Sequence, residues 1–207
     1  MNLFAIERKL NAFLCKIAVI SDEKLKMLAA QPSYAAKMRY ANSVFKKLKA
    51  GSSRIVYDYS PDLVLKMAKN EKGLAQNRVE SDNFLQTNYK DLVANVIDSD
   101  PNDIWILSEK ATKIAPSRFR SLTGIDFKEF CNYLYAHNPV APPKIKTPIA
   151  NEEQLDDNPF IQEILDMMGN FQMPYGDLSR ISSWGEVKGR AVLIDYGLTQ
   201  DIYEQYY

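Results

Sequence analysis

Residues 54–68 read RIVYDYSPDLVLKMA and carry the strongest fold signal in the chain. Two runs rich in β-branched, aromatic and aliphatic residues, 54–59 and 63–68, flank the triplet Ser60-Pro61-Asp62. Such runs are typical of strands, and Ser-Pro-Asp is typical of a tight turn. The segment therefore predicts a β-hairpin whose second strand carries a lysine, Lys66, among apolar side chains.

Further strand and helix patterns flank this hairpin on both sides. A preceding strand is predicted to end at Gly51, and residues 70–89 have a weak helical periodicity. Two short strands are expected at 92–97 and 104–108, separated by the turn sequence DSDPND at 98–103. We therefore expect a unit of five strands and one helix.

The first fifty residues predict helices. Apolar residues recur at helical spacing between Leu3 and Ile17, and charged residues interrupt them, which indicates an amphipathic helix and not a signal peptide. Ser21 is expected to cap a second helix that ends near Pro32, and a third helical pattern begins at Tyr34. Because these apolar stripes are regular, we expect the helices to pack on the five-stranded unit.

The second half of the chain is mainly helical in pattern. Short helices are expected at 127–135 and 160–168, with a proline-rich connection over 138–159 between them. A short apolar strand follows at 191–194. Strands therefore concentrate in one part of the chain and helices in another, which predicts the α+β class.

These patterns divide the chain into three parts. We predict a helical N-terminal extension over residues 1–44, a small lobe of strands over 45–111, and a reduced helical lobe over 112–207.

The composition excludes several classes of function. The 26 basic and 26 acidic residues cancel to a formal net charge of zero, so no nucleic-acid partner is expected. No apolar run is long enough to span a membrane. Cys15 and Cys131 make neither a metal-ligand spacing nor a disulfide framework, and His137 is the only histidine. We therefore expect a cytoplasmic protein without a zinc site or a histidine-based triad.

The turn after the predicted first strand is a candidate phosphate-binding element. Gly51 permits close approach, and Ser52 and Ser53 add hydroxyl donors to the backbone N–H groups. A plain hairpin turn is the alternative interpretation.

Lys66 is a candidate for binding an anion. A lysine within an apolar strand needs an anionic partner if it is buried. Glu80, fourteen positions later on the predicted helix, is the expected partner, and Glu71 competes for that role. The alternative is a lysine on an edge strand that faces water.

Two aspartates in the last third are candidates for complementary chemical roles. Asp177 lies in Tyr175-Gly176-Asp177, and Asp195 follows the short apolar strand, 195 − 177 = 18 positions later. One carboxylate would accept or orient a hydroxyl proton while the other holds Mg²⁺. Taken alone, each is equally compatible with an ordinary turn aspartate.

In their fixed order, these elements resemble the protein-kinase-like superfamily over residues 45–198. Tyr175-Gly176-Asp177 is similar to the His-Gly-Asp motif of small-molecule kinases of the aminoglycoside phosphotransferase type. Asp195-Tyr196-Gly197 stands where protein kinases carry Asp-Phe-Gly. The chain is also similar to the short kinase-like reading frames of tailed bacteriophages.

The resemblance implies a site for ATP and Mg²⁺ between two lobes. Lys66 would bind the α- and β-phosphates and Glu80 would orient it, while Asp177 aligns the acceptor hydroxyl. Asp195 would hold the metal, with Ser182 at the second metal-ligand position. The implied nucleotide contacts are Gly51, Ser52, Ser53, Val56, Val64, Lys66, Leu107 and Glu109.

The sequence also departs from the family pattern. Ser182 occupies the position of the family's asparagine, and a serine hydroxyl is a shorter and poorer Mg²⁺ ligand. Lys49 and Arg54 replace two glycines of the phosphate loop. The chain ends ten residues after Gly197, which leaves no room for an activation segment or for the helices that bind peptide substrates.

Two functions follow from this resemblance. The first is phosphotransfer from ATP to a protein hydroxyl, the protein's own hydroxyls included. The second is a pseudokinase that serves as a protein-binding module, so the expected partner is a protein in either case. Adenylyl transfer is a third activity that the fold supports.

Overall fold

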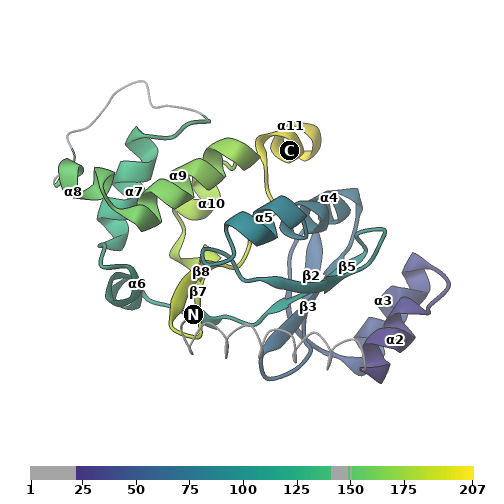
Figure 1. The fold of residues 1–207 in the computed structure, drawn as a ribbon. Coiled ribbons are helices and arrows are strands. Elements are labelled where there is room, and N and C mark those ends of the chain that lie inside the picture. The colour runs from purple at the N-terminus through teal and green to yellow at the C-terminus, as the bar shows by residue number, and fades with distance from the viewer. Residues whose placement is uncertain (1–21, 141–148, 150) are drawn as a thin grey trace. The chain divides into compact units, whose positions relative to one another are not determined.

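In a computed structural model of the chain, residues 22–140, 149 and 151–207 are described (Figure 1). The described residues up to Leu74, together with Val96–Ser108, form one compact unit. Ala75–Asn95 and Glu109–Tyr207 form a second unit. The structure combines helices with antiparallel sheets, so the predicted α+β class is confirmed.

The first unit is built on a five-stranded sheet with the strand order β1-β2-β3-β5-β4. The pairs β1–β2, β2–β3 and β4–β5 are antiparallel, and the predicted hairpin is present with Val56 opposite Lys66. The elements of this unit are α2 (Glu23–Ala29), α3 (Tyr34–Val44), β1 (Lys46–Ala50), β2 (Arg54–Asp58), β3 (Leu63–Ala68), β4 (Val96–Ser99) and β5 (Trp105–Glu109). The last residue of β5 belongs to the second unit.

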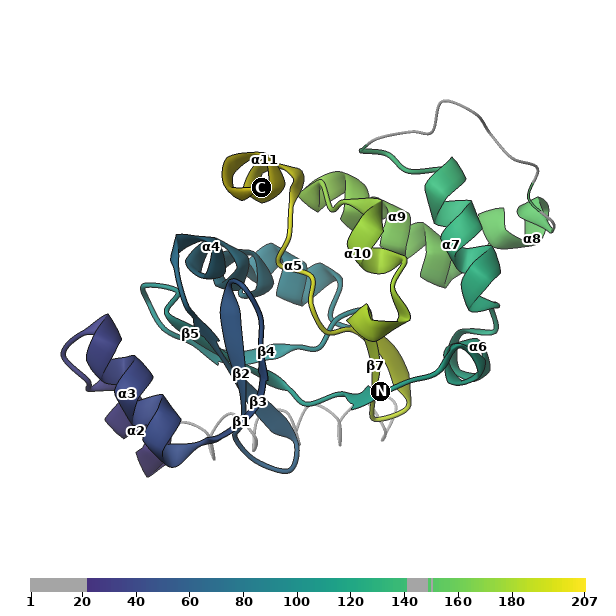
Figure 2. The ribbon, with the colours of Figure 1, turned by 180° about the vertical axis from the view of Figure 1, so that it is seen from behind.

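One face of this sheet packs on α2 and α3, which lie side by side (Figure 2). The side chains that form this core are Leu25, Leu28, Ala41, Phe45, Ile55, Tyr57, Leu63, Leu65, Met67, Trp105 and Leu107. Because side chains alternate along a strand, Val56, Val64, Lys66 and Ile106 lie on the other face. The expected packing of the N-terminal helices on the sheet is confirmed for α2 and α3. The expected first helix lies outside the described residues.

A buried ion pair links α3 to the turn between β4 and β5. Lys37 Nζ lies 3.3 Å from Asp100 Oδ2, and both side chains are less than one-tenth exposed. The same ammonium donates to the carbonyl of Ala29 at 2.7 Å. The cap of α2 is Asp22, the residue after the expected Ser21, and its side chain accepts from the backbone N–H of Lys24. A carboxylate at this end also interacts favourably with the helix dipole.

The second unit consists of helices around a small antiparallel sheet with the order β6-β7-β8. Helix α4 (Glu71–Glu80) begins in the first unit and ends in the second. The other elements are α5 (Asn83–Asn88), β6 (Thr112–Lys113), α6 (Pro116–Thr123), α7 (Phe127–Ala136), α8 (Glu152–Asp156), α9 (Pro159–Phe171), α10 (Tyr175–Leu178), the 3₁₀ turn η1 (Ile181–Ser183), β7 (Trp184–Val187), β8 (Arg190–Leu193) and α11 (Gln200–Tyr206). Within the described part of the chain, no helix has the length and apolar character needed to cross a membrane.

Two predicted elements in residues 70–97 differ from the structure. The helix expected over 70–89 is two helices, because the Asp82 side chain caps α5 by accepting from the N–H of Leu85 at 3.0 Å. The strand expected from residue 92 begins only at Val96. Val93 instead forms an isolated parallel bridge with Leu193 at the end of β8, and both residues are buried.

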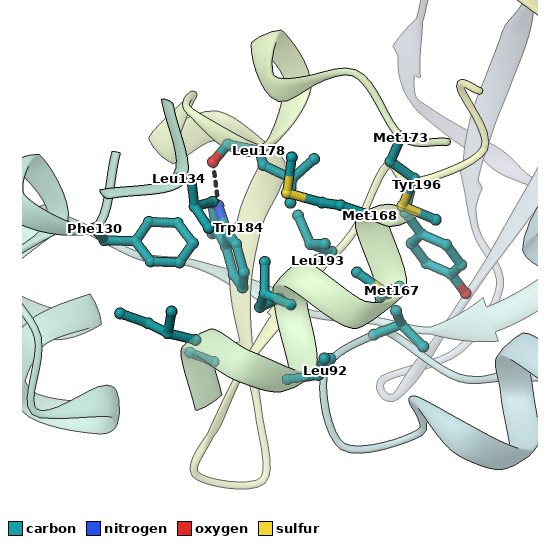
Figure 3. Packing of buried hydrophobic residues seen from close by; sticks show 14 of the residues in the cluster. Leu92, Phe130, Leu134, Met167, Met168, Met173, Leu178, Trp184, Leu193 and Tyr196 are labelled. Carbon is teal, nitrogen blue, oxygen red and sulfur yellow. Dashed lines mark hydrogen bonds between the residues drawn. The ribbon is translucent and has the colours of Figure 1, made fainter. Parts of the chain in front are cut away.

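The core of the second unit surrounds Trp184 at the start of β7 (Figure 3). Its indole packs against the rings of Phe119 and Phe130, with centroids 5.2 and 5.5 Å away. The indole N–H donates to the carbonyl of Leu178 at 2.8 Å. This bond fixes the end of α10, the helix that carries Asp177, to the sheet.

Candidate functional site

The turn between β1 and β2 is tied to the segment that follows β3. The N–H of Gly51 donates to the carbonyl of Arg54 at 2.8 Å, which closes the turn. The backbone N–H of Lys69 donates to the carbonyl of Ser53 at 2.7 Å. A Cβ built on Gly51 would make only ordinary contact, 3.7 Å from the nearest heavy atom. The fold therefore tolerates a side chain at Gly51, and its role as a nucleotide contact stays a prediction.

Lys66 lies in the middle of β3, an interior strand between β2 and β5. Its residue surface is only 5% exposed, so the alternative of an edge-strand lysine facing water is wrong. Val64 and Val56 share the face of Lys66, opposite the core on α2 and α3. Glu80 belongs to the second unit, so the predicted Lys66–Glu80 ion pair would join the two units and stays a prediction.

Leu107 has its side chain in the core of the first unit, on the face of β5 opposite that of Lys66. A contact between Leu107 and a nucleotide would therefore have to come from its backbone. A backbone contact between Leu107 and a nucleotide stays a prediction.

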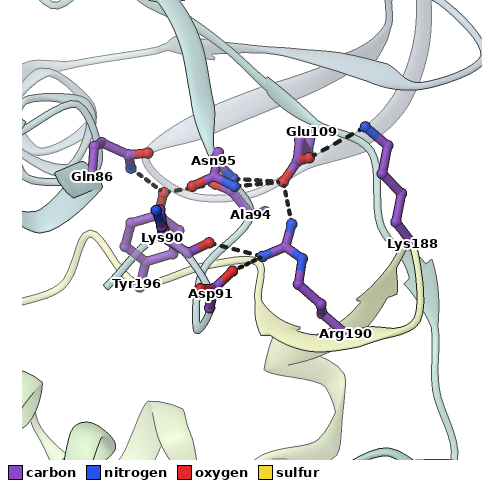
Figure 4. A network of polar contacts seen from close by, with 9 residues as sticks. All are labelled: Gln86, Lys90, Asp91, Ala94, Asn95, Glu109, Lys188, Arg190 and Tyr196. Carbon is purple, nitrogen blue, oxygen red and sulfur yellow. Dashed lines mark hydrogen bonds and ion pairs between the residues drawn. The ribbon is translucent and has the colours of Figure 1, made fainter. Parts of the chain in front are cut away.

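The carboxylate of Glu109 is the centre of a polar network in the second unit (Figure 4). Its Oε2 accepts from the backbone N–H and the side-chain amide of Asn95, at 3.1 and 2.9 Å. The guanidinium of Arg190 donates to the same oxygen at 2.9 Å, and Lys188 Nζ lies 3.9 Å from Oε1. The side chain of Glu109 thus fixes the chain at Asn95 to β8. Sequence reasoning missed this role, because Arg190 is 81 positions away.

The negative charge of Asp195 acts electrostatically on Asp177. The predicted convergence of the two carboxylates on one cavity stays a prediction. Asp177 lies in α10, and Asp195 is exposed just after β8. Burial raises the pKa of Asp177 above its ordinary range, and the negative charge of Asp195 raises it further. The guanidinium of Arg180, 3.4 Å from Asp177 Oδ1, opposes that rise in pKa.

Tyr196, the residue after Asp195, is anchored at both its backbone and its side chain. Its backbone N–H donates to Glu80 Oε1 at 3.3 Å, and its hydroxyl donates to the carbonyl of Ala94 at 2.8 Å. The Gln86 amide donates to the same hydroxyl at 2.9 Å and to the carbonyl of Glu80 at 2.6 Å. Tyr196 is only 3% exposed and Glu80 is fully buried. These contacts fix the backbone that places Asp195.

Gly197 is the last residue of the Asp-Tyr-Gly segment, and its position has no room for a side chain. A Cβ at this position would lie 2.5 Å from the carbonyl oxygen of Gln76 in α4. Real Cβ atoms do not approach that closely, so the segment reaches α4 only because residue 197 is glycine. The glycine therefore serves the close packing of two chain segments.

Ser182 is exposed in η1, between α10 and β7. The neighbouring residue Ser183 is buried, and its carbonyl accepts from the N–H of Ile194. The carboxylate of Asp195 is a ligand type that fits Mg²⁺, because this ion takes one or two carboxylates and completes its shell with phosphates and water. Across residues 22–140, 149 and 151–207, no group of three or more His, Cys, Asp or Glu side chains could hold a metal. The predicted metal-binding roles of Asp195 and Ser182 stay predictions.

Comparisons with known proteins found similarity among solved structures but not among known sequences. Neither the known protein families nor the curated proteins contain a match to the sequence. The streptomycin–ATP–APH(2″)-IIa ternary complex is similar, with a TM-score of 0.34 and 11% sequence identity. The likeness covers 77% of this chain and 70% of that one.

Proposed function

We propose that this chain is a protein-kinase-like phosphotransferase that transfers the γ-phosphoryl group of ATP to a protein hydroxyl. The observation that carries the proposal is the coupled pair Asp177 and Asp195, with Asp195 held in place by the buried contacts of Tyr196 and Glu80. A carboxyl group whose pKa is raised by burial and by a second carboxylate is suited to accept a hydroxyl proton, and the second carboxylate is suited to hold a divalent cation.

Each residue has a distinct role in this proposal. Bound Mg²⁺ would neutralise charge on the β- and γ-phosphates, and Asp195 would hold it. Asp177 would accept a hydrogen bond from the acceptor hydroxyl and orient its oxygen toward the γ-phosphorus. The buried ammonium of Lys66 would compensate the charge of the remaining phosphates. The bond from the γ-phosphorus to the bridging oxygen breaks, the bond to the acceptor oxygen forms, and the hydroxyl proton passes to Asp177.

Hydroxyls of this chain itself are candidate acceptors. Tyr203 and Tyr207 are 50% and 67% exposed, and their rings stack with centroids 5.5 Å apart. Ser52 is exposed at the tip of the turn between β1 and β2. Autophosphorylation would therefore be found by mapping phosphate in the C-terminal helix and in this turn.

A second candidate function is a kinase-like protein-binding module without transfer activity. Ser182 favours it, because an exposed serine stands where the resemblance requires an amide ligand for the metal. In this alternative, the pair Asp177 and Asp195 would be retained without bound nucleotide.

Incubation with γ-labelled or α-labelled ATP in the presence of Mg²⁺ or Mn²⁺ tests the proposal. Label transferred from the γ-position alone supports phosphotransfer, and label from the α-position indicates adenylyl transfer. Absence of both label transfer and ATP binding would refute the proposal and favour the protein-binding module.

A further inference from the structure

The turn at residues 51–53 is held from one side by the segment that follows β3. Lys69 Nζ donates to the carbonyl of Gly51 at 2.8 Å, and the Asn70 side-chain amide donates to the carbonyl of Ser52 at 3.2 Å. The backbone N–H of Lys69 donates to the carbonyl of Ser53 at 2.7 Å. Three successive carbonyl oxygens of the turn are therefore fixed by two neighbouring residues.

Asn70 also connects this arrangement to α4. Its side-chain oxygen accepts from the N–H of Gly73 at 3.1 Å, which caps the helix, while its amide group holds Ser52. A Cβ on Gly73 would lie 2.2 Å from the carbonyl oxygen of Ser53. The turn and the start of α4 consequently approach as closely as two backbones can, and this approach requires glycine at position 73.

Fixing the carbonyls also fixes the direction of the N–H groups. In a planar trans peptide, the carbonyl of one residue and the N–H of the next point in opposite directions. The N–H groups of Ser52 and Ser53 must therefore point away from Lys69 and Asn70. Successive N–H groups on a common side form a concave site that suits a phosphate oxygen.

We propose that Lys69 and Asn70 are positioning residues that hold the N–H groups of Ser52 and Ser53 toward the phosphates of a nucleotide. This inference rests on the proposed function. The two polar side chains would give the turn the rigid geometry that a phosphate loop needs. In this turn, Lys49 and Arg54 replace the glycines of the family pattern. Lys69 acts through the turn and does not itself touch the nucleotide.

The test compares Lys69→Met with the matched variant Lys47→Met. Both lysines are exposed and both changes remove one positive charge, but Lys47 lies on β1 away from the tip of the turn. Dissociation constants for ATP and for adenosine are measured by calorimetry on the full chain with Mg²⁺. We expect Lys69→Met to weaken ATP binding about tenfold and adenosine binding less than about twofold, because the turn contacts only phosphates. Lys69→Arg keeps a donor and should restore most of the ATP affinity.

Two results overturn the inference while leaving the proposed function intact. One is an unchanged ratio of ATP to adenosine affinity in Lys69→Met. The other is an equal loss in Lys47→Met, which would mean that only general positive charge matters. If the unaltered chain binds adenosine and ATP equally or binds neither, the proposed function itself fails and this inference falls with it.

Discussion

The backbone N–H of Tyr196 donates to the carboxylate of Glu80 at 3.3 Å, which joins the Asp-Tyr-Gly segment to the end of α4. The two residues are 116 positions apart, and both are buried. Glu80 thus has a structural contact in the second unit in addition to its predicted pairing with Lys66.

Substitution of Glu80 by Gln separates these two roles. The amide oxygen of Gln can still accept from Tyr196, so the free energy of unfolding should stay near that of the unaltered chain. The charge that would orient Lys66 is lost, and we expect kcat/KM for ATP to fall about tenfold. Urea denaturation and steady-state kinetics measure the two effects. Full activity in Glu80→Gln would contradict the assignment of Glu80 as the partner of Lys66.

Gly197 and Gly176 form a matched pair for a stability test. Ala at position 197 would place its Cβ 2.5 Å from the Gln76 carbonyl oxygen, whereas a Cβ at Gly176 meets nothing within 4 Å. We expect Gly197→Ala to lower the free energy of unfolding by about 1–3 kcal/mol and Gly176→Ala to leave it nearly unchanged. Equal stability of the two variants would mean that the Asp-Tyr-Gly segment does not pack on α4 as described.

The pKa of Asp177 predicts how stability depends on pH. Burial and the charge of Asp195 raise this pKa in the folded state above its value in the unfolded chain. At a pH between the unfolded and the folded pKa of Asp177, the folded state binds more protons than the unfolded state. The contribution of Asp177 to the free energy of unfolding therefore falls as pH rises through this range. Asp177→Asn should therefore be more stable than the unaltered chain at pH 7, and the difference should vanish below about pH 4, the unfolded value. Unfolding free energies measured from pH 3 to 7 provide the check. A variant that is less stable at pH 7 would show that the Asp177 charge is favourably compensated.

Ser182 distinguishes the enzyme from the protein-binding module. An asparagine oxygen reaches farther than a serine hydroxyl and is a better ligand for a hard cation. In an enzyme, Ser182→Asn should give transfer activity equal to or higher than that of the unaltered chain at limiting Mg²⁺, with Ser182→Ala as the control that adds no ligand. A clear loss of transfer in Ser182→Asn would instead assign the serine a role of its own, for example as the phosphoacceptor.

Local sequence signals predicted much of the first unit. The hairpin over residues 54–68 was predictable because its turn and its two apolar runs are adjacent in sequence. Which side chains of each strand point into the core was not predictable. The reason is that β3 is buried along its whole length and lacks the alternation of apolar and polar residues that a half-buried strand shows. Leu107 was for this reason expected at the nucleotide site, although its side chain lies in the core on the opposite face from Lys66.

In the second unit, the motifs marked Asp177 and Asp195 as candidates, but the contacts that hold the neighbouring Tyr196 were not predictable from the sequence. Gln86 and Ala94 hold Tyr196 from 110 and 102 positions away, and no pattern in the sequence marks such a contact. The break between α4 and α5 was missed because Ser81 and Asp82 interrupt the weak helical period without a proline or glycine. The available signal for this break was Asp82, because aspartate is a residue type that often caps the start of a helix.

The most direct test of the central claim is transfer of γ-label from ATP by the unaltered chain and by Asp195→Asn, with Asp201→Asn as the control. Asp201 is an exposed carboxylate in α11, so its loss changes the net charge equally. We predict Mg²⁺-dependent transfer by the unaltered chain and by Asp201→Asn, and a loss on the order of 100-fold or more in Asp195→Asn. Transfer by Asp195→Asn at the rate of the unaltered chain would contradict the account.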